Sequence, residues 1–222
     1  MAFRVVVADD HEVVRRGLCE LVANHPGWEV CGEARDGREA VAQVASVRPD
    51  AIILDIAMPN LNGLEAARQI LKNDPKTKVL ILTLHGSPQV IQDVVSAGAR
   101  GFLLKSDAVR DLVSALEAIQ EGKIYFTSKV ASTVLDGYLH KDGPPAVEMP
   151  ASRQLTARER EIVQLLAEGK TCRGVAEALG LSVKTAETHR SNIMRKLELH
   201  SVSDLVLFAI RNNIVHVSEP QK

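Results

Sequence analysis

The sequence has few aromatic residues and few cysteines. Phe, Trp and Tyr together make up 3% of the 222 residues, whereas hydrophobic residues make up 45%. Because aromatic side chains are scarce, the core must consist mainly of Val, Ile, Leu and Ala. Cys19, Cys31 and Cys172 are odd in number, far apart and outside any CxxC pair, which argues against a disulfide framework and against a zinc site. We therefore expect three buried, reduced thiols.

The sequence also lacks a long hydrophobic run. The apolar stretch near the N-terminus covers only a few residues and ends at Asp9 and Asp10. It is too short for a signal peptide or for the roughly 20 residues of a membrane span. We expect a protein that has no membrane segment and stays in the cytoplasm.

Chain length and charge distribution favour two domains. A typical domain has about 100 to 150 residues, so this chain suffices for two small cores. The net charge is −1, yet residues 1–126 hold 14 Lys and Arg against 17 Asp and Glu, whereas residues 152–222 hold 11 against 8. A mildly basic C-terminal part is consistent with contact to phosphates, but this balance alone also fits an ordinary surface.

Residues 1–125 alternate short β-branched runs with longer amphipathic stretches, a pattern typical of successive βα units and a parallel sheet. The predicted strands are 4–8, 29–34, 51–54, 79–83 and 101–104, and the predicted helices are 12–24, 37–46, 63–72, 88–97 and 107–121. The sheet-facing stripe of the last helix comprises Val109, Leu112, Val113, Leu116 and Ile119. This order predicts a doubly wound α/β domain, whose functional residues lie at the carboxyl ends of the strands.

A linker follows at 126–152. Its second half, from residue 140, combines glycine, three prolines and charges without an apolar period. The amphipathic run at 129–139 is compatible with a short helix of the linker.

From residue 153 to 217 only helical patterns remain, and residues 218–222 form a tail. Thr156 and Glu159 form a capping-box pattern ahead of an apolar face that ends at 168–169. A second helix covers about 173–179, a third begins after Ser182 and reaches about Leu197, and a fourth follows Ser201 and ends near 212–213. We expect a four-helix, all-α domain.

Polar side chains follow several of the predicted strands. Asp9 and Asp10 follow the first strand, Asp55 follows the third, Thr83 ends the fourth and Lys105 follows the fifth. Three carboxylates at one sheet edge repel each other, which favours a hard divalent cation such as Mg²⁺. Together with a lysine and a hydroxyl, the cation favours phosphoryl transfer to Asp55 as nucleophile. Each residue alone fits a helix cap, a strand end or a solvated side chain; their joint placement favours the site.

With these residues, the stretches LDIAMPNLNG and GFLLK resemble the receiver domain of bacterial two-component response regulators over about residues 3–125. The resemblance implies a flavodoxin-like, five-stranded parallel sheet in the order 2-1-3-4-5. It also implies Mg²⁺ ligands at Asp9, Asp10, Asp55 and the backbone carbonyl of Ala57, with Asp55 accepting the phosphoryl group of a sensor histidine kinase.

By the same resemblance, Thr83 and Lys105 contact the phosphoryl group. Phe102 matches the aromatic residue whose rotamer follows Thr83, although plain core packing also accounts for a phenylalanine there. The chain departs from the family at Ala57, Leu84 and Ser106, which bears on the lifetime of the phosphorylated state and on the loop after Lys105.

The third helix of the C-terminal domain has two contrasting faces. Its predicted inward residues are Val183, Ala186, Ile193 and Leu197, and its predicted outward polar residues are Lys184, Thr185, Glu187, Thr188, Ser191 and Arg195. Such side chains suit a helix in the major groove of DNA, where they reach phosphates and base edges. A merely solvated helix face is the alternative.

The stretch from LTARERE to RKLEL resembles the LuxR/NarL-type helix-turn-helix domain over about residues 153–216, so the whole chain resembles a NarL/FixJ-type response regulator. The resemblance implies that the polar residues of the third helix bind a double-stranded DNA operator and that the final helix, about 203–212, is a dimer contact. The chain departs from the family at 172–174. Gly174 weakens the start of its helix by up to about 1 kcal/mol relative to alanine, and Arg173 could compensate through a phosphate contact.

We therefore expect a transcription regulator in which phosphorylation of Asp55 moves Thr83 and Phe102 and favours a homodimer with released DNA-binding domains. An aspartyl-phosphate phosphatase would carry a DxD motif, whereas position 57 is alanine. A receiver acting through protein contacts and a DNA-binding protein with a vestigial acidic site are the remaining alternatives.

Overall fold

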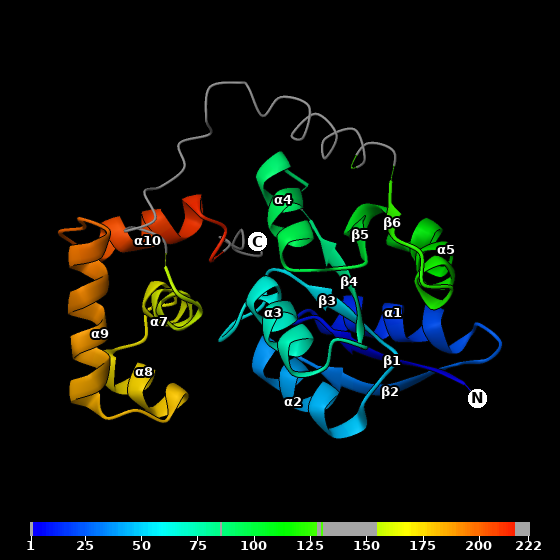
Figure 1. Cartoon of the computed structure of the whole chain (residues 1–222), viewed down its shortest axis with the longest axis horizontal. Helices are drawn as coiled ribbons and strands as arrows, with labels where there is room; N and C mark the ends of the chain where they lie inside the picture. The colour runs from blue at the N-terminus through cyan, green and yellow to red at the C-terminus, as the bar shows by residue number, and fades with distance from the viewer. Residues whose placement is uncertain (1, 85, 128–129, 131–154, 216–222) are drawn as a thin grey trace. The chain divides into compact units, whose positions relative to one another are not determined.

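The computed structural model describes residues 2–84, 86–127, 130 and 155–215 (Figure 1). The chain forms two compact units, Met1–Gly143 and Pro144–Lys222. The run expected to form a linker helix at 129–139 lies outside the described residues except for Val130, and so does the expected tail at 218–222. No helix in the described ranges is long and apolar enough to cross a membrane.

The first unit alternates strands and helices as the sequence pattern predicts. Its elements are β1 Phe3–Ala8, α1 Glu12–Ala23, β2 Trp28–Ala34, α2 Gly37–Val47, β3 Ala51–Asp55, α3 Gly63–Asn73, β4 Lys78–Thr83, α4 Pro88–Ser96, β5 Gly101–Leu104, the 3-10 turn η1 Lys105–Asp107, α5 Ala108–Gln120 and β6 Tyr125–Phe126.

The strands form one parallel sheet in the order β2-β1-β3-β4-β5-β6. The predicted order of the first five strands is confirmed, but the prediction of a five-stranded sheet is wrong. The sixth strand has only two residues, which pair with Gly101 and Phe102 of β5. Two residues are too few for an alternating pattern, so β6 could not be recognised from the sequence.

Two hydrophobic clusters cover the two faces of the sheet. One contains side chains of α2, α3 and α4, and the other contains side chains of α1 and α5. Every residue of β3 is buried because helices cover both of its faces. This burial accounts for the continuous apolar run that precedes Asp55.

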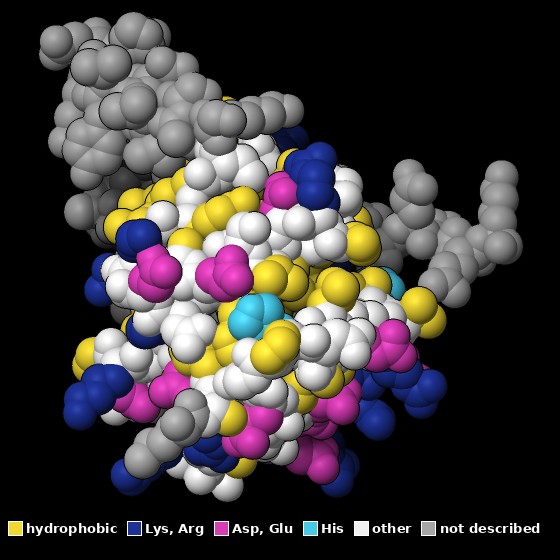
Figure 2. All heavy atoms as spheres, turned by 90° about the vertical axis from the view of Figure 1, so that its right-hand side faces the viewer, with side chains coloured by type: hydrophobic (Ala, Val, Ile, Leu, Met, Phe, Trp, Pro, Cys, Tyr) yellow, Lys and Arg dark blue, Asp and Glu magenta, His cyan; other side chains and the backbone are white. Residues whose placement is uncertain are grey.

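The apolar stripe of α5 differs from the prediction at one residue. Leu112, Leu116 and Ile119 are buried, but Val109 is 82% exposed. The buried stripe begins at Ala108, four residues before Leu112, so Val109 lies about 100° around the helix from it. Figure 2 shows hydrophobic side chains lying among charged ones on the surface turned toward the viewer.

The second unit contains the four predicted helices: α7 Ala157–Ala167, α8 Cys172–Leu179, α9 Val183–Lys196 and α10 Val202–Arg211. Capping boxes begin α7 at Thr156 and α10 at Ser201. Ser182 caps α9 by accepting a hydrogen bond from the backbone N–H of Thr185. Helix α8 begins one residue earlier than predicted because Thr171 caps it.

The core of the second unit includes Ala186 and Ile193 of α9 and the C-cap residue Leu197, as predicted. Val183 was also expected to face inward, but it is 44% exposed. Val183 is the first residue of α9, directly after the turn that contains Gly180, and it precedes Ala186, the first residue of the helix that belongs to the core.

The three cysteines are free thiols, as predicted, but they are half-buried and not buried. Cys31 lies on β2, which is an edge strand of the sheet, and Cys19 lies on the flank of α1. Burial nevertheless raises the pKa of Cys19 to about 11 and also raises the pKa of Cys31.

Candidate functional site

Acidic side chains from two strands meet at the carboxyl edge of the sheet. Asp9 and Asp10 follow β1, and Asp55 is the last residue of β3, which pairs with β1. One ligand atom from each of Asp9, Asp10, His11 and Asp55 lies within 4.8 Å of the others. The structure therefore brings the three predicted carboxylates together.

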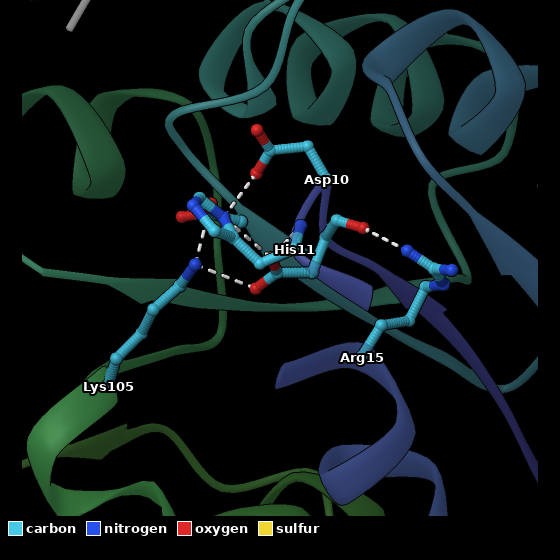
Figure 3. Close-up of polar contacts among 6 residues, drawn as sticks. Asp10, His11, Arg15 and Lys105 are labelled. Atoms are coloured by element: carbon cyan, nitrogen blue, oxygen red, sulfur yellow. Dashed lines mark hydrogen bonds and ion pairs between the residues drawn. The ribbon is translucent and has the colours of Figure 1, made fainter. Parts of the chain in front are cut away.

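Lys105 reaches into this acidic cluster from the end of β5 (Figure 3). Its Nζ lies 2.7 Å from Asp9 Oδ2 and 2.8 Å from Asp55 Oδ2. The exposed fractions of these side chains are 7%, 0% and 1% for Lys105, Asp9 and Asp55. One buried ammonium thus serves two buried carboxylates, and Asp10 adds a third negative charge beside them.

The electrostatics of the cluster favour a further cation. Burial raises the pKa of Asp55 even though Lys105 opposes the shift, and the charge of Asp9 adds to it. For Lys105, burial lowers the pKa but the carboxylates of Asp55 and Asp9 raise it more, so the amine stays protonated. Asp55 Oδ1 is buried and has no hydrogen-bond partner among the described residues. An oxygen-rich cluster with unbalanced negative charge fits Mg²⁺.

His11 joins the cluster, which the sequence analysis did not predict. Its Nδ1 lies 2.7 Å from Asp10 Oδ1, and its backbone N–H donates to Asp9 Oδ1 at 2.9 Å. His11 is also the N-cap residue of α1, where no side chain makes a capping hydrogen bond. Asp9 and Asp10 therefore do not serve as caps of α1. The sequence signal that could have predicted His11 as a member of the cluster is its place directly after Asp10.

Thr83 and Phe102 occupy the neighbouring strands. Thr83 ends β4 and is buried one residue beyond Leu82, which pairs with Asp55. Phe102 is buried in the hydrophobic cluster on the face of α2, α3 and α4. Ala57 is half-buried in the loop between β3 and α3. These positions are compatible with the expected roles and, for Phe102, equally with core packing.

Helix α9 presents the predicted polar residues to solvent. All six of them are exposed: Lys184, Thr185, Glu187, Thr188, Ser191 and Arg195. A shallow hollow on this surface is lined by Ser182, Lys184, Thr185, Thr188, His189 and Asn192. Three of the six predicted residues line it. His189 and Asn192 line it as well, and Asn192 continues the four-residue spacing of Lys184 and Thr188.

Hydrogen bonds within α9 constrain several of these side chains. The Thr188 hydroxyl donates to the backbone carbonyl of Lys184 at 2.9 Å. The Arg195 guanidinium donates to Asn192 Oδ1 at 3.0 Å. Lys184 carries the exposed charge nearest the start of the helix, where it remains available to an anion.

Polar contacts from α7 hold the two following helices in place. Lys196 Nζ of α9 lies 2.7 Å from Glu159 Oε2, and this contact lowers the pKa of Glu159 against the opposing effect of burial. Arg158 donates to the backbone carbonyl of Leu179, the last residue of α8. The end of α8, where the turn to α9 begins, is thereby tied to α7.

Both units match known families. Residues 5–117 match the family described as "Response regulator receiver domain", and residues 153–209 match "Bacterial regulatory proteins, luxR family". The transcriptional regulatory protein LiaR of Bacillus subtilis strain 168 is 37% identical over 96% of this chain and 99% of its own length. The response regulator protein VraR of Staphylococcus aureus strain Mu3 is 33% identical over 97% of this chain and 100% of its own length.

Solved structures show the same similarity. A two-component response regulator of the LuxR family from Aurantimonas sp. SI85-9A1 is 32% identical with a TM-score of 0.59, over 63% of this chain and 99% of that chain. The RcsB response regulator of Salmonella typhimurium, whose structure was described in connection with DNA interaction, is 25% identical with a TM-score of 0.57, over 93% and 97%.

Proposed function

The chain belongs to the response regulators that join a receiver domain to a LuxR-type helix-turn-helix domain, and on this premise we propose that it is a DNA-binding transcription regulator controlled by phosphorylation of Asp55. The observation that supports this most directly is the buried contact of Lys105 with both Asp9 and Asp55, next to Asp10.

In this proposal the phosphoryl donor is a sensor histidine kinase. A carboxylate oxygen of Asp55 attacks the phosphorus of a phosphohistidine, the P–N bond breaks, and the imidazole leaves as the P–O bond forms. Asp9, Asp10, Asp55 and the carbonyl of Ala57 would hold Mg²⁺, which would neutralise charge on the phosphoryl oxygens. Burial keeps water from the Asp55 carboxylate, and Lys105 and Thr83 contact the transferred group.

Phosphorylation is proposed to shift a population and not to create a new fold. In the unphosphorylated protein, the Lys105 ammonium bridges the carboxylates of Asp9 and Asp55. A phosphoryl group on Asp55 would compete with these carboxylates for the ammonium. Thr83 and Phe102 lie on the adjacent strands β4 and β5, through which the change would reach the neighbouring helices α4 and α5. The phosphorylated state would favour a homodimer that presents two recognition helices to half-sites about one turn of DNA apart.

Regulation of transcription is supported by the similarity to LiaR, which is a transcriptional regulatory protein. A phosphatase with an aspartyl-phosphate intermediate is disfavoured because the residue two positions after Asp55 is Ala57, which cannot act as a general acid.

The phosphoacceptor is tested by intact-protein mass spectrometry after incubation with a small acyl phosphate and Mg²⁺. We expect wild type to gain one phosphoryl group, Asp55→Asn to gain none, and the control Asp93→Asn on α4 to behave as wild type. No gain in wild type would contradict the proposal and favour a DNA-binding protein with a silent acidic site.

DNA binding is tested by selecting fragments from a random duplex pool with the phosphorylated protein, followed by gel-shift titration. We expect Lys184→Ala and Thr188→Ala to weaken binding, whereas Lys76→Ala, which removes an exposed positive charge from the turn between α3 and β4 of the first unit, should have little effect. Failure to select any fragment would favour an action through protein contacts. Retention of binding by both α9 variants would contradict the role of this helix.

A further inference from the structure

Arg15 is a buried arginine outside the residues that the phosphoacceptor chemistry uses. It lies on the first turn of α1 and is 5% exposed. Its backbone N–H donates to the carbonyl of His11, as expected at a helix start. A buried guanidinium is costly unless its donors find partners. The partners of Arg15 therefore indicate what the residue does.

The Arg15 guanidinium connects the loop that carries Asp9 with strand β2. Nη1 donates to the backbone carbonyl of Asp9 at 2.9 Å, and this hydrogen bond is buried. Nε donates to Glu33 Oε2 on β2 at 3.0 Å. Figure 3 shows the Arg15 side chain directed at this carbonyl oxygen, on the far side of the loop from Lys105.

The carbonyl that Arg15 holds belongs to the peptide unit between Asp9 and Asp10. Because a peptide unit is planar, fixing its oxygen fixes the direction in which the chain leaves Asp9 and enters Asp10. The preceding peptide is held as well, since the backbone N–H of Asp9 donates to the carbonyl of Ala34 on β2. Arg15 thus helps to fix the backbone from which the two carboxylates project.

We propose that Arg15 is a positioning residue for the divalent cation: it orients Asp9 and Asp10 as ligands without touching the ion or the phosphoryl group. This inference rests on the proposed function, because it assumes that the acidic cluster binds Mg²⁺. Outer partners that orient metal ligands typically contribute about 10- to 100-fold to metal affinity.

The sign of the effect separates positioning from simple electrostatics. Arg15 carries a positive charge next to the ligand loop, so its charge alone repels a cation. If Arg15 acted only through its charge, its removal would strengthen Mg²⁺ binding. If it orients the ligands, its removal weakens Mg²⁺ binding.

Arg4 provides a matched control. Its guanidinium also pairs with a glutamate of β2, with Nε 3.0 Å from Glu29 Oε1, and also donates to a backbone carbonyl, that of Val47 at 2.7 Å. It lies near the start of β1, whereas the acidic cluster follows the end of that strand. Arg4→Met therefore removes the same kinds of contact away from the cation site.

The experiment is isothermal titration of Mg²⁺ into the full-length chain in wild-type, Arg15→Met, Arg15→Lys and Arg4→Met forms, with thermal unfolding measured in parallel. We expect the Kd for Mg²⁺ to rise about 10- to 100-fold in Arg15→Met and to stay within about twofold of wild type in Arg4→Met. Arg15→Lys should give an intermediate Kd, because one ammonium can keep the bond to Asp9 but cannot span both partners as a guanidinium does.

Unchanged or tighter Mg²⁺ binding in Arg15→Met would overturn the inference while leaving the proposed function intact. If Arg15→Met does not fold, Arg15→Gln, which also loses the guanidinium but keeps a polar side chain, is measured instead, and a Kd equal to that of wild type overturns the inference in the same way. Wild-type protein that binds no Mg²⁺ would instead overturn the metal site of the proposed function, and this inference with it.

Discussion

Gly63 sets how closely helix α3 can approach the end of β3, where the proposed phosphoacceptor Asp55 lies. A Cβ atom added at this position would lie 1.9 Å from the carbonyl oxygen of Asp55 and 3.0 Å from the Cα of Ile56. Contacts of a Cβ below 3.0 Å are essentially never found, so Gly63→Ala requires a shift of about 1 Å or more. The obstructing atoms belong to the backbone, which cannot rotate away as a side chain can. The substitution must therefore displace α3 or the Asp55 backbone.

Overpacking of this kind typically costs about 1 to 3 kcal/mol, and we expect the upper part of that range because backbone must move. For a domain of this size, 1 kcal/mol corresponds to roughly 4 °C in melting temperature. We thus predict a decrease of roughly 8 to 12 °C and slower phosphoryl transfer to the displaced Asp55. Trp28 is the single tryptophan and lies in the first unit, so its fluorescence follows the unfolding of that unit alone.

Gly17→Ala is the control for a glycine in an open environment. Gly17 lies on α1 with nothing within 4 Å of an added Cβ, so alanine should stabilise the helix by up to about 1 kcal/mol. The two substitutions add the same methyl group and should shift the melting temperature in opposite directions. A Gly63→Ala protein that melts and accepts a phosphoryl group like wild type would refute the close approach of α3 to Asp55.

Three further predictions concern the cation, an ion pair and a thiol. Mg²⁺ at 100 times its Kd should stabilise the first unit by about 2.7 kcal/mol over EDTA, as followed by Trp28 fluorescence, and Asp10→Asn should lose most of this gain; equal melting of wild type in both solutions would contradict a cation site. Lys196→Met should lower the stability of the second unit by about 1 kcal/mol in urea unfolding followed by circular dichroism. The pKa of Glu159 is lowered in the folded state. The stability difference between wild type and Lys196→Met should therefore be present at pH values above the ordinary carboxyl pKa and vanish as the pH falls through the folded-state pKa of Glu159. A stability difference that does not change with pH would argue against the ion pair. Burial raises the pKa of Cys19 to about 11, so its alkylation rate, measured by peptide mass spectrometry, should rise about tenfold per pH unit toward that value, and an earlier plateau would count against this environment.

The sequence allowed the three carboxylates and Lys105 to be predicted as one cluster because each lies at the end of a strand or within two residues after it. Strands β1, β3 and β5 are short apolar runs with distinct ends, so the positions of Asp9, Asp55 and Lys105 followed once the strands were recognised. Parallel pairing then required those ends to meet at one edge.

Other features depend on contacts that sequence spacing does not reveal. The burial of Arg15 depends on Glu33, which lies on β2 and reaches α1 only because β2 pairs with β1. The exposure of Val109 and of Val183 follows from where a helix begins relative to its buried stripe, and a shift of one residue at a helix start rotates the stripe by about 100°. Helical periodicity predicted the stripes well, but not their first residues.

The acidic cluster links the chemistry of the receiver to the stability of its fold. Burial raises the pKa of Asp55, Lys105 opposes this effect, and the net shift is upward. A carboxyl group with a raised pKa in the folded state stabilises the fold while it is protonated, and this contribution is lost as the pH rises through the folded-state value. Burial thus disfavours the ionised form of Asp55, and a bound cation would offset that cost. Free energy gained by binding a cation at the acidic cluster is for this reason also free energy of folding. The proposed cation site would thus couple the stability of the first unit to the binding of the ion.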